Sequence, residues 1–321
     1  MLKSEDRVRV TAQLVDALTG QDLWAQRYDR KWEDIFKLQD DITQHIIANL
    51  LSLEGPLEKA TLIKIEQKAP SDLRAYDYLL LGREQLFLVT NESNIKARKL
   101  FQKSLEIEPD YSRGHTWMAW AHLVDLNFGW AENPAKSRET SLFHGQRAIE
   151  LDNSDAEAHW ALAATMIHAG HQQQKALAEY QKAISLSPNN ADLLAEYGWT
   201  ISKIGKSDDG VMSIKQAMRL NPVHPDWYNW GLIFALYTAK RYEEVVDVAE
   251  KINVRHLPIC LELAGSYAQL GRKEEAQEAA LNALKLQPEF SLSWWRERLS
   301  FSNPEALEDY MEGLIKAGLP A

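Results

Sequence analysis

The sequence predicts a mainly α protein, a superhelix of stacked helical hairpins preceded by a partial α/β fragment. One observation is a short pattern that recurs six times between residues 100 and 290. Its copies end at Pro109, Asn153, Pro188, Pro222, Val254 and Pro288, which lie 44, 35, 34, 32 and 34 residues apart. Another is an alanine five residues before that position in most copies. A period near 34 residues is typical of helix–turn–helix arrays, which offer an extended surface for a partner rather than a pocket for chemistry.

Residues 1–52 have a different pattern and form the partial α/β fragment. Polar and apolar side chains alternate from Arg7 to Leu14, which predicts a half-buried strand. After the turn "DALTGQD", the stretch "LWAQRYDR" predicts a second strand. The stretch "EDIFKLQDDITQHIIANLL" then predicts a helix. The apolar stripe of that helix consists of Ile35, Leu38, Ile42, Ile46 and Leu50.

Two strands and one helix are too few to form an independent core. Three alternatives follow: further strands precede this fragment, the hairpin docks on the first repeat, or it pairs with another chain through its open edges. The last alternative predicts self-association through the N-terminal hairpin. Residues 53–75 are expected to link the fragment to the array as a helix flanked by loops.

Residues 76–288 contain the repeats, each with two helices. In the first helix of one unit, Leu194, Tyr197, Gly198 and Ile201 share a stripe, and the small residue lets the partner helix approach. The predicted turn that follows carries Gly170, Gly205 and Gly271 in three units, with Ala239 in the corresponding place of a fourth. The second helices carry small residues for close packing: Ala176 and Ala183 in one unit, and Ala276, Ala280 and Ala283 in another.

This combination of period, small residues and final proline resembles the tetratricopeptide repeat. Asn153 and Val254 depart from the pattern at the proline position, and the second unit is longer than the others around "FGWAENPAKS". Residues 289–321 are expected to form capping helices, with Trp294 at the start of an incomplete seventh unit. In the final amphipathic helix, "PEALEDYMEGLIKAG", the side chains expected to face inward are Leu307, Tyr310, Met311 and Leu314.

A second resemblance concerns the segment before the repeats. The stretch "VRVTAQLVDALTGQDLWAQRYDRKWEDIFKLQDDIT" looks like the end of a TolB-like or FlgO-like α/β domain. The insert "FGWAENPAKS" and the ending "LEDYMEGLIKAGLPA" are similar to the C-terminal half of bacterial class III adenylate/guanylate cyclase-like proteins. The resemblance implies a sensory or scaffolding segment without its output domain. Two alternatives stay open: a fragment of a nucleotide cyclase whose catalytic domain lies upstream, or the sensor segment of a winged-helix transcriptional regulator.

Composition limits the classes of partner. Lys and Arg number 36 against 46 Asp and Glu, and a net charge of −10 argues against a nucleic-acid partner. The chain has no run of eighteen apolar residues, so no membrane insertion is expected. Cys260 is the one cysteine, which excludes an internal disulfide and a multi-cysteine metal site. We expect a cytoplasmic location, with periplasmic exposure as part of a larger protein left open.

The sequence offers weak candidates for chemistry, and each has a structural reading. "GKS" at 205–207 lacks the earlier glycine of a phosphate-binding loop, since Thr200 stands there. The pair His168 and His171 lacks further metal ligands nearby. His115 and His159 share one repeat position, which favours packing, and Cys260 falls at a core position. We therefore predict no catalytic, cofactor-binding or metal-binding residues, no cofactor and no enzyme activity.

The remaining candidate site is the concave groove lined by the first helices. The repeat register places a set of large side chains toward it: Trp117, Trp120, Trp160, Trp199, Asn229 and Trp230. Tryptophan is a favoured interface anchor because it is large, stiff and amphipathic. The competing interpretation is that these rings pack between adjacent repeats. The sequence thus predicts a non-catalytic scaffold for a protein or peptide partner, the regulatory segment of a bacterial signalling protein.

Overall fold

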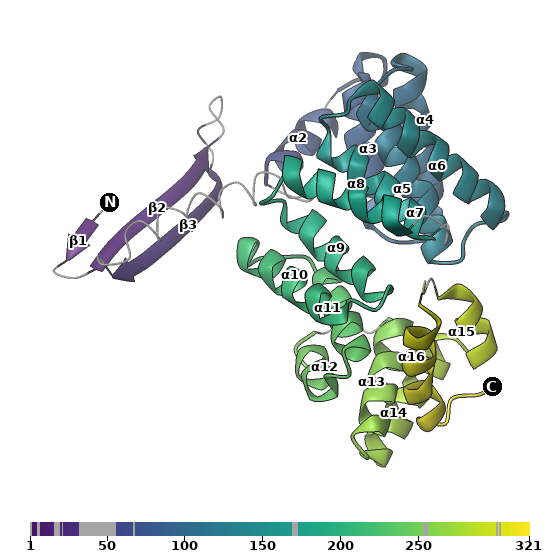
Figure 1. Ribbon diagram of the computed structural model, residues 1–321. Helices are drawn as coiled ribbons and strands as arrows, with labels where there is room; N and C mark the ends of the chain where they lie inside the picture. The colour runs from purple at the N-terminus through teal and green to yellow at the C-terminus, as the bar shows by residue number, and fades with distance from the viewer. Residues whose placement is uncertain are drawn as a thin grey trace.

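The computed structural model describes residues 2–4, 7–15, 20, 22–31, 56–66, 68–168, 173–252, 256–299, 301 and 303–321. Most of them are helical, and successive antiparallel helix pairs stack along the chain (Figure 1). The predicted mainly α superhelix is therefore confirmed. The helix expected over 33–51, with Ile35, Leu38, Ile42, Ile46 and Leu50, lies outside the described residues, as do Gly170 and Val254.

The N-terminal strands form a small antiparallel sheet in the order β1-β2-β3. The strands are β1 (Leu2–Ser4), β2 (Arg7–Val15) and β3 (Asp22–Lys31). Both predicted strands are present, and β1 is an addition to them. Arg9 and Asp29 face each other across β2 and β3, and the Arg9 Nη2 atom lies 2.9 Å from Asp29 Oδ2. Strand β3 also contacts α2 (Pro56–Glu66), the helix that precedes the repeats.

Six helix pairs follow within the described residues, after the short 3-10 helix η2 (Pro70–Asp72). The pairs are α3 (Ala75–Phe87) with α4 (Asn91–Ile107), α5 (Ser112–Asn127) with α6 (Pro134–Leu151), α7 (Ala156–His168) with α8 (Gln173–Leu186), α9 (Ala191–Ser202) with α10 (Ser207–Leu220), α11 (Trp227–Thr238) with α12 (Tyr242–Ala249), and α13 (Leu257–Gln269) with α14 (Lys273–Leu286). The chain ends with α15 (Leu292–Arg298) and α16 (Pro304–Lys316).

The repeated alanine explains how the second helices approach their neighbours. Five equivalent positions are fully buried: Ala148, Ala183, Ala217, Ala249 and Ala283. In the first repeat Ser104 takes this place, and its hydroxyl donates a 2.8 Å hydrogen bond to the Ala75 carbonyl oxygen. A larger side chain here would hold the packed helices apart, because protein interiors have few voids to receive it. The sequence period thus reports a recurring helix contact.

The turns between paired helices require a left-handed residue, and glycine supplies it in two repeats. Gly205 and Gly271 have φ angles of +85° and +75°. The prediction that Ala239 takes this place is wrong: the left-handed residue is Lys240, with φ +60°. The start of the following helix fixes the register, because α10, α12 and α14 each begin two residues after this position. In the first repeat Val89 occupies the same place, with φ +49°.

Val89→Gly is expected to raise the free energy of unfolding by about 1 kcal/mol, since the left-handed conformation costs a branched side chain roughly that amount. Chemical unfolding of the wild type and the variant measures the change. Leu88 provides a matched control, because it is exposed and has an ordinary helical φ of −69°. Leu88→Gly should lower stability. Equal effects of the two substitutions would contradict the left-handed conformation of Val89.

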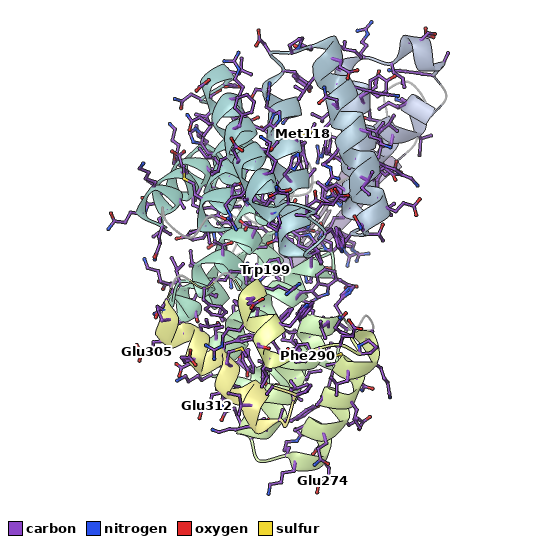
Figure 2. All side chains as sticks on the ribbon, turned by 90° about the vertical axis from the view of Figure 1, so that its right-hand side faces the viewer. Met118, Trp199, Glu274, Phe290, Glu305 and Glu312 are labelled. Carbon is purple, nitrogen blue, oxygen red and sulfur yellow. The ribbon has the colours of Figure 1, made fainter. Side chains whose placement is uncertain are left out.

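Buried side chains form two large clusters along the array. One cluster runs from Ile65 in α2 to Ile204 after α9, and the other from Val211 in α10 to Leu319 after α16. The partly buried Trp199 packs against the second cluster. Figure 2 shows Trp199 at mid-height, between the first helix pairs of the array and the α15–α16 segment. The two halves of the core therefore meet near α9.

Candidate functional site

The weak chemical candidates have structural roles. Gly205 forms the left-handed turn after α9, so the "GKS" segment follows a helix and not a strand. His115 Nε2 lies 2.9 Å from the Pro109 carbonyl oxygen, and His159 Nε2 lies 3.0 Å from that of Asn153. In both repeats a histidine thus ties a helix to the preceding loop, which confirms the packing interpretation.

The remaining chemical candidates are Cys260 and the pair His168 and His171. Cys260 is buried at 3 % exposure. Among the described residues, no cluster of three or more His, Cys, Asp or Glu side chains could hold a metal ion. The side chains of His168 and His171 lie outside the described residues. Within the described part of the chain, every helix is too short or too polar to cross a bilayer.

The predicted groove residues lie on first helices of four successive repeats, from α5 to α11. The indole rings of Trp120 and Trp160 meet edge to face, with centroids 5.1 Å apart. Trp117 and Trp160 are only 2 % and 3 % exposed, so their rings pack between neighbouring helices. The other four predicted residues, Trp120, Trp199, Asn229 and Trp230, are partly exposed. These four are the members of the set that a partner could reach.

A partly buried carboxyl on α9 lies among these first helices. Glu196 accepts hydrogen bonds from Trp160 Nε1 at 2.8 Å, from the Tyr180 hydroxyl at 2.7 Å and from the Thr200 hydroxyl at 2.7 Å. Burial raises the pKa of the Glu196 carboxyl, and these donors act in the opposite direction. Sequence reasoning missed this residue, because a single Glu in an amphipathic helix gives no sign of donors that lie 16 and 36 positions away.

The C-terminal helix lies across the first helices of the last two repeats. α16 packs mainly on α13 and also contacts α11. As predicted, Tyr310, Met311 and Leu314 are buried, and Leu307 is partly buried. The Tyr237 hydroxyl of α11 donates a 3.0 Å hydrogen bond to the Tyr310 carbonyl oxygen. The sequence indicated which face of α16 is buried, but not the surface that it covers.

The close approach of α16 depends on two glycines. A Cβ atom placed on Gly313 would overlap the Tyr237 hydroxyl and would lie 3.3 Å from the Gly265 Cα atom of α13. Polar contacts hold the edges of the helix: Lys240 Nζ lies 2.8 Å from Asp309 Oδ2, and Lys316 Nζ donates to Gln269 at 2.8 Å. Figure 2 shows Glu305 and Glu312 pointing away from the body of the protein.

The segment before α16 reaches back along the array. A Cβ atom placed on Gly129, in the longer connection of the second repeat, would lie 3.6 Å from Arg298 Nε at the end of α15. One placed on Gly205, at the α9–α10 turn, would lie 2.9 Å from Asn303 Nδ2. After α14 the chain therefore returns toward the second repeat before α16 runs past repeats four, five and six.

Glu262 of α13 lies beneath α16, with a side chain only 2 % exposed. Its partner is the Tyr310 hydroxyl, at 3.4 Å from Oε1. Burial raises the pKa of the Glu262 carboxyl well above its usual range. The nearby Ser266 hydroxyl is fully buried and has no hydrogen-bond partner among the described residues.

Glu262→Gln is expected to stabilise the protein at pH 8, by about 1 kcal/mol or more. A raised pKa in the folded state means that the contribution of Glu262 is fully present below about pH 4.3, the unfolded value, and is lost as the pH rises through the folded pKa. The other ionisable groups facing it, Tyr310 and Tyr237, have raised pKa values and stay neutral in this range. Unfolding midpoints at pH 5 and pH 8 measure the effect, and a difference between variant and wild type that does not grow with pH would contradict it.

Comparisons with known proteins agree with the repeat architecture. Models of the tetratricopeptide repeat match residues 179–211 and 257–290. The second match covers α13, α14 and Phe290. The crystal structure titled "APC/C hetero-tetramer Cut9-Hcn1" superposes with a TM-score of 0.59 and 15% identity, over 80% of this chain and 46% of that one. These matches confirm the tetratricopeptide-repeat fold, which is typically a non-catalytic scaffold for protein–protein interaction.

Curated relatives align with parts of the chain. The protein named "Putative adenylate cyclase 3" of Rhizobium meliloti is 32% identical over 161 residues, which are 50% of this chain and 27% of the relative. "Transcriptional regulator HilA" of Salmonella typhimurium is 23% identical over 244 residues, 73% of this chain and 42% of the relative. The chain thus spans less than half the length of either relative.

Proposed function

We propose that this chain binds a helix or extended peptide of a partner protein on the surface of its first helices, and that it is the regulatory or sensory segment of a bacterial signalling protein in the cytoplasm. The observation that carries the proposal is that this surface already holds a helix, α16, against α11 and α13. A surface that buries one amphipathic helix has the width and the apolar character to accept another.

The partly exposed tryptophans support the same conclusion. Trp199 and Trp230 pack against the C-terminal core cluster and keep part of their surface accessible. Their indole N–H groups have no acceptor in the part of the chain that the structure describes. These two N–H groups are themselves buried, so a partner would contact the accessible part of each ring rather than its N–H. Large, partly exposed aromatic side chains are typical interface anchors.

The test compares partner binding by the wild type with binding by Trp199→Ala and Trp230→Ala. We expect each substitution to weaken binding more than tenfold, because buried aromatic anchors dominate interface energetics. Phe143→Ala is the matched control, because Phe143 is an exposed aromatic residue (61 %) on the second helix α6. Unchanged binding by both tryptophan variants would show that this surface does not bind the partner.

The names of the relatives suggest a second candidate, the fragment of a nucleotide cyclase. We expect the 321-residue chain not to convert ATP to cyclic AMP, because class III chemistry requires two metal-binding aspartates on a ferredoxin-like sheet. Incubation of the purified chain with ATP and Mg²⁺ or Mn²⁺, followed by detection of cyclic AMP, measures this. Turnover above that of the heat-denatured chain would show that the chain is an enzyme and would overturn the scaffold proposal.

A further inference from the structure

The surface beneath α16 contains polar groups that α16 matches poorly. The Glu262 carboxyl is almost fully buried, and the Tyr310 hydroxyl at 3.4 Å is farther away than in an ordinary O–H···O hydrogen bond. The Ser266 hydroxyl, one turn further along α13, is fully buried without a partner in the described part of the chain. Buried polar groups without good partners cost free energy. The docked position of α16 therefore leaves the Glu262 carboxyl and the Ser266 hydroxyl without strong hydrogen bonds.

The carboxyl on α9 shows what a structurally satisfied glutamate looks like in this protein. Glu196 has three hydrogen-bond donors, Trp160, Tyr180 and Thr200, all supplied by the repeats themselves. The hydrogen bond found for the Glu262 side chain instead comes from α16. The repeats therefore build the surroundings of Glu196, whereas the pairing of Glu262 depends on whatever helix covers α13.

We propose that the surface of α11 and α13 is the docking site for a partner's amphipathic helix with a lysine or arginine opposite Glu262, and that α16 occupies the site until this helix replaces it. This inference rests on the proposed function and deepens it. A cation at the position of Tyr310 would form a charge-assisted hydrogen bond with Glu262 where α16 offers a long neutral one. An acidic chain, with net charge −10, also attracts a basic helix.

The close contact with α13 further defines the partner. Because Gly313 faces Tyr237 and Gly265, the partner helix needs a very small residue three positions after its cation. Leu307 and Leu314, three positions before Tyr310 and four after it, pack in the C-terminal core cluster, so apolar residues belong there. The edge contact between Lys240 and Asp309 is 56 % and 42 % exposed and adds little to the hold of α16. The apolar face is therefore the part of α16 that a partner must reproduce.

Synthetic peptides with the sequence of residues 303–318 test the proposal, one with the native sequence and one with Tyr310→Lys. The receptor is the full chain carrying Gly313→Leu, which frees the surface of its own helix. We expect the lysine peptide to bind at least tenfold more tightly by fluorescence anisotropy, and Glu262→Gln in the receptor to remove that advantage. A lysine peptide that also carries Gly313→Leu is the control and should not bind.

Equal affinities of the two peptides, an advantage that survives Glu262→Gln, or no binding of either would overturn the inference. Should the Gly313→Leu chain fail to fold, the wild-type chain serves instead. An excess of the lysine peptide should then displace α16 and reduce carbodiimide cross-linking of Lys240 to Asp309, and unchanged cross-linking would count against the inference. The proposed function fails separately, when Trp199→Ala and Trp230→Ala leave binding of the natural partner intact.

Discussion

Gly198→Ala is expected to lower the free energy of unfolding by about 2–3 kcal/mol. Gly198 lies where α9 crosses α10, and a Cβ atom there would lie 2.5 Å from the Gly210 carbonyl oxygen and 2.7 Å from Ile214 Cγ1. The first contact is with backbone, which cannot rotate away as a side chain can. The two helices would therefore have to separate, which would loosen the packing between them.

Gly231→Ala is the matched control. Gly231 also lies inside a first helix, but a Cβ atom there would lie 3.4 Å from Trp199 Cβ and 3.6 Å from Ile214 Cδ1, which is ordinary contact. Alanine is the better helix former by about 1 kcal/mol, so this variant should be neutral or more stable. Urea unfolding followed by circular dichroism measures both. Similar losses for the two variants would show that the close crossing of α9 and α10 is not what makes Gly198 necessary.

Gly313→Leu is expected to release α16 from α11 and α13 while the repeats keep their structure. The added side chain would meet the buried Tyr237 hydroxyl and the backbone of α13 at Gly265, and this backbone cannot yield without moving a helix. Hydrogen exchange with mass spectrometry should show α16 amides exchanging more than 100-fold faster, since they would lose the protection of a packed helix. Amides of α3–α8 should keep their wild-type rates.

Ile315→Ala is the control for this experiment. Ile315 is 56 % exposed on the same helix, so its truncation should leave α16 protected. Fast exchange in both variants would mean that α16 is only loosely docked in the wild type, and fast exchange throughout the chain in Gly313→Leu would mean that α16 is required for the repeats to fold. Either outcome would contradict the proposal that α16 docks on a surface that the repeats form without it.

The repeat architecture could be predicted because its signals are local. These signals are the period near 34 residues, the recurring alanine (Ala183 and Ala217, for example) and the histidine that recurs as His115 and His159. Each of them reflects a contact within one repeat or between neighbouring repeats. The turn register was less secure, because Ala239 and Lys240 are adjacent and neither is a glycine. Only the start of the next helix decides between them.

The arrangement of α16 could not be predicted from such signals. The hydrogen bonds from Tyr310 to Glu262 and from Tyr237 to Tyr310 join residues 48 and 73 positions apart. An amphipathic helix after the last repeat has the same pattern whether it covers the end of the stack or the first helices. The tryptophans pose a related difficulty: Trp117 is buried and Trp120 is partly exposed, although they lie one turn apart on α5.

Zero-length cross-linking tests the docked position of α16 most directly. A carbodiimide joins amines and carboxylates that are already in contact, and Lys240 Nζ lies 2.8 Å from Asp309 Oδ2 with both side chains accessible. The pair Lys316 and Glu312 within α16, also at 2.8 Å, serves as the internal standard. We predict a Lys240–Asp309 isopeptide in the wild type and its absence in Gly313→Leu. A wild-type chain that yields the Lys316–Glu312 product without the Lys240–Asp309 product would contradict the account.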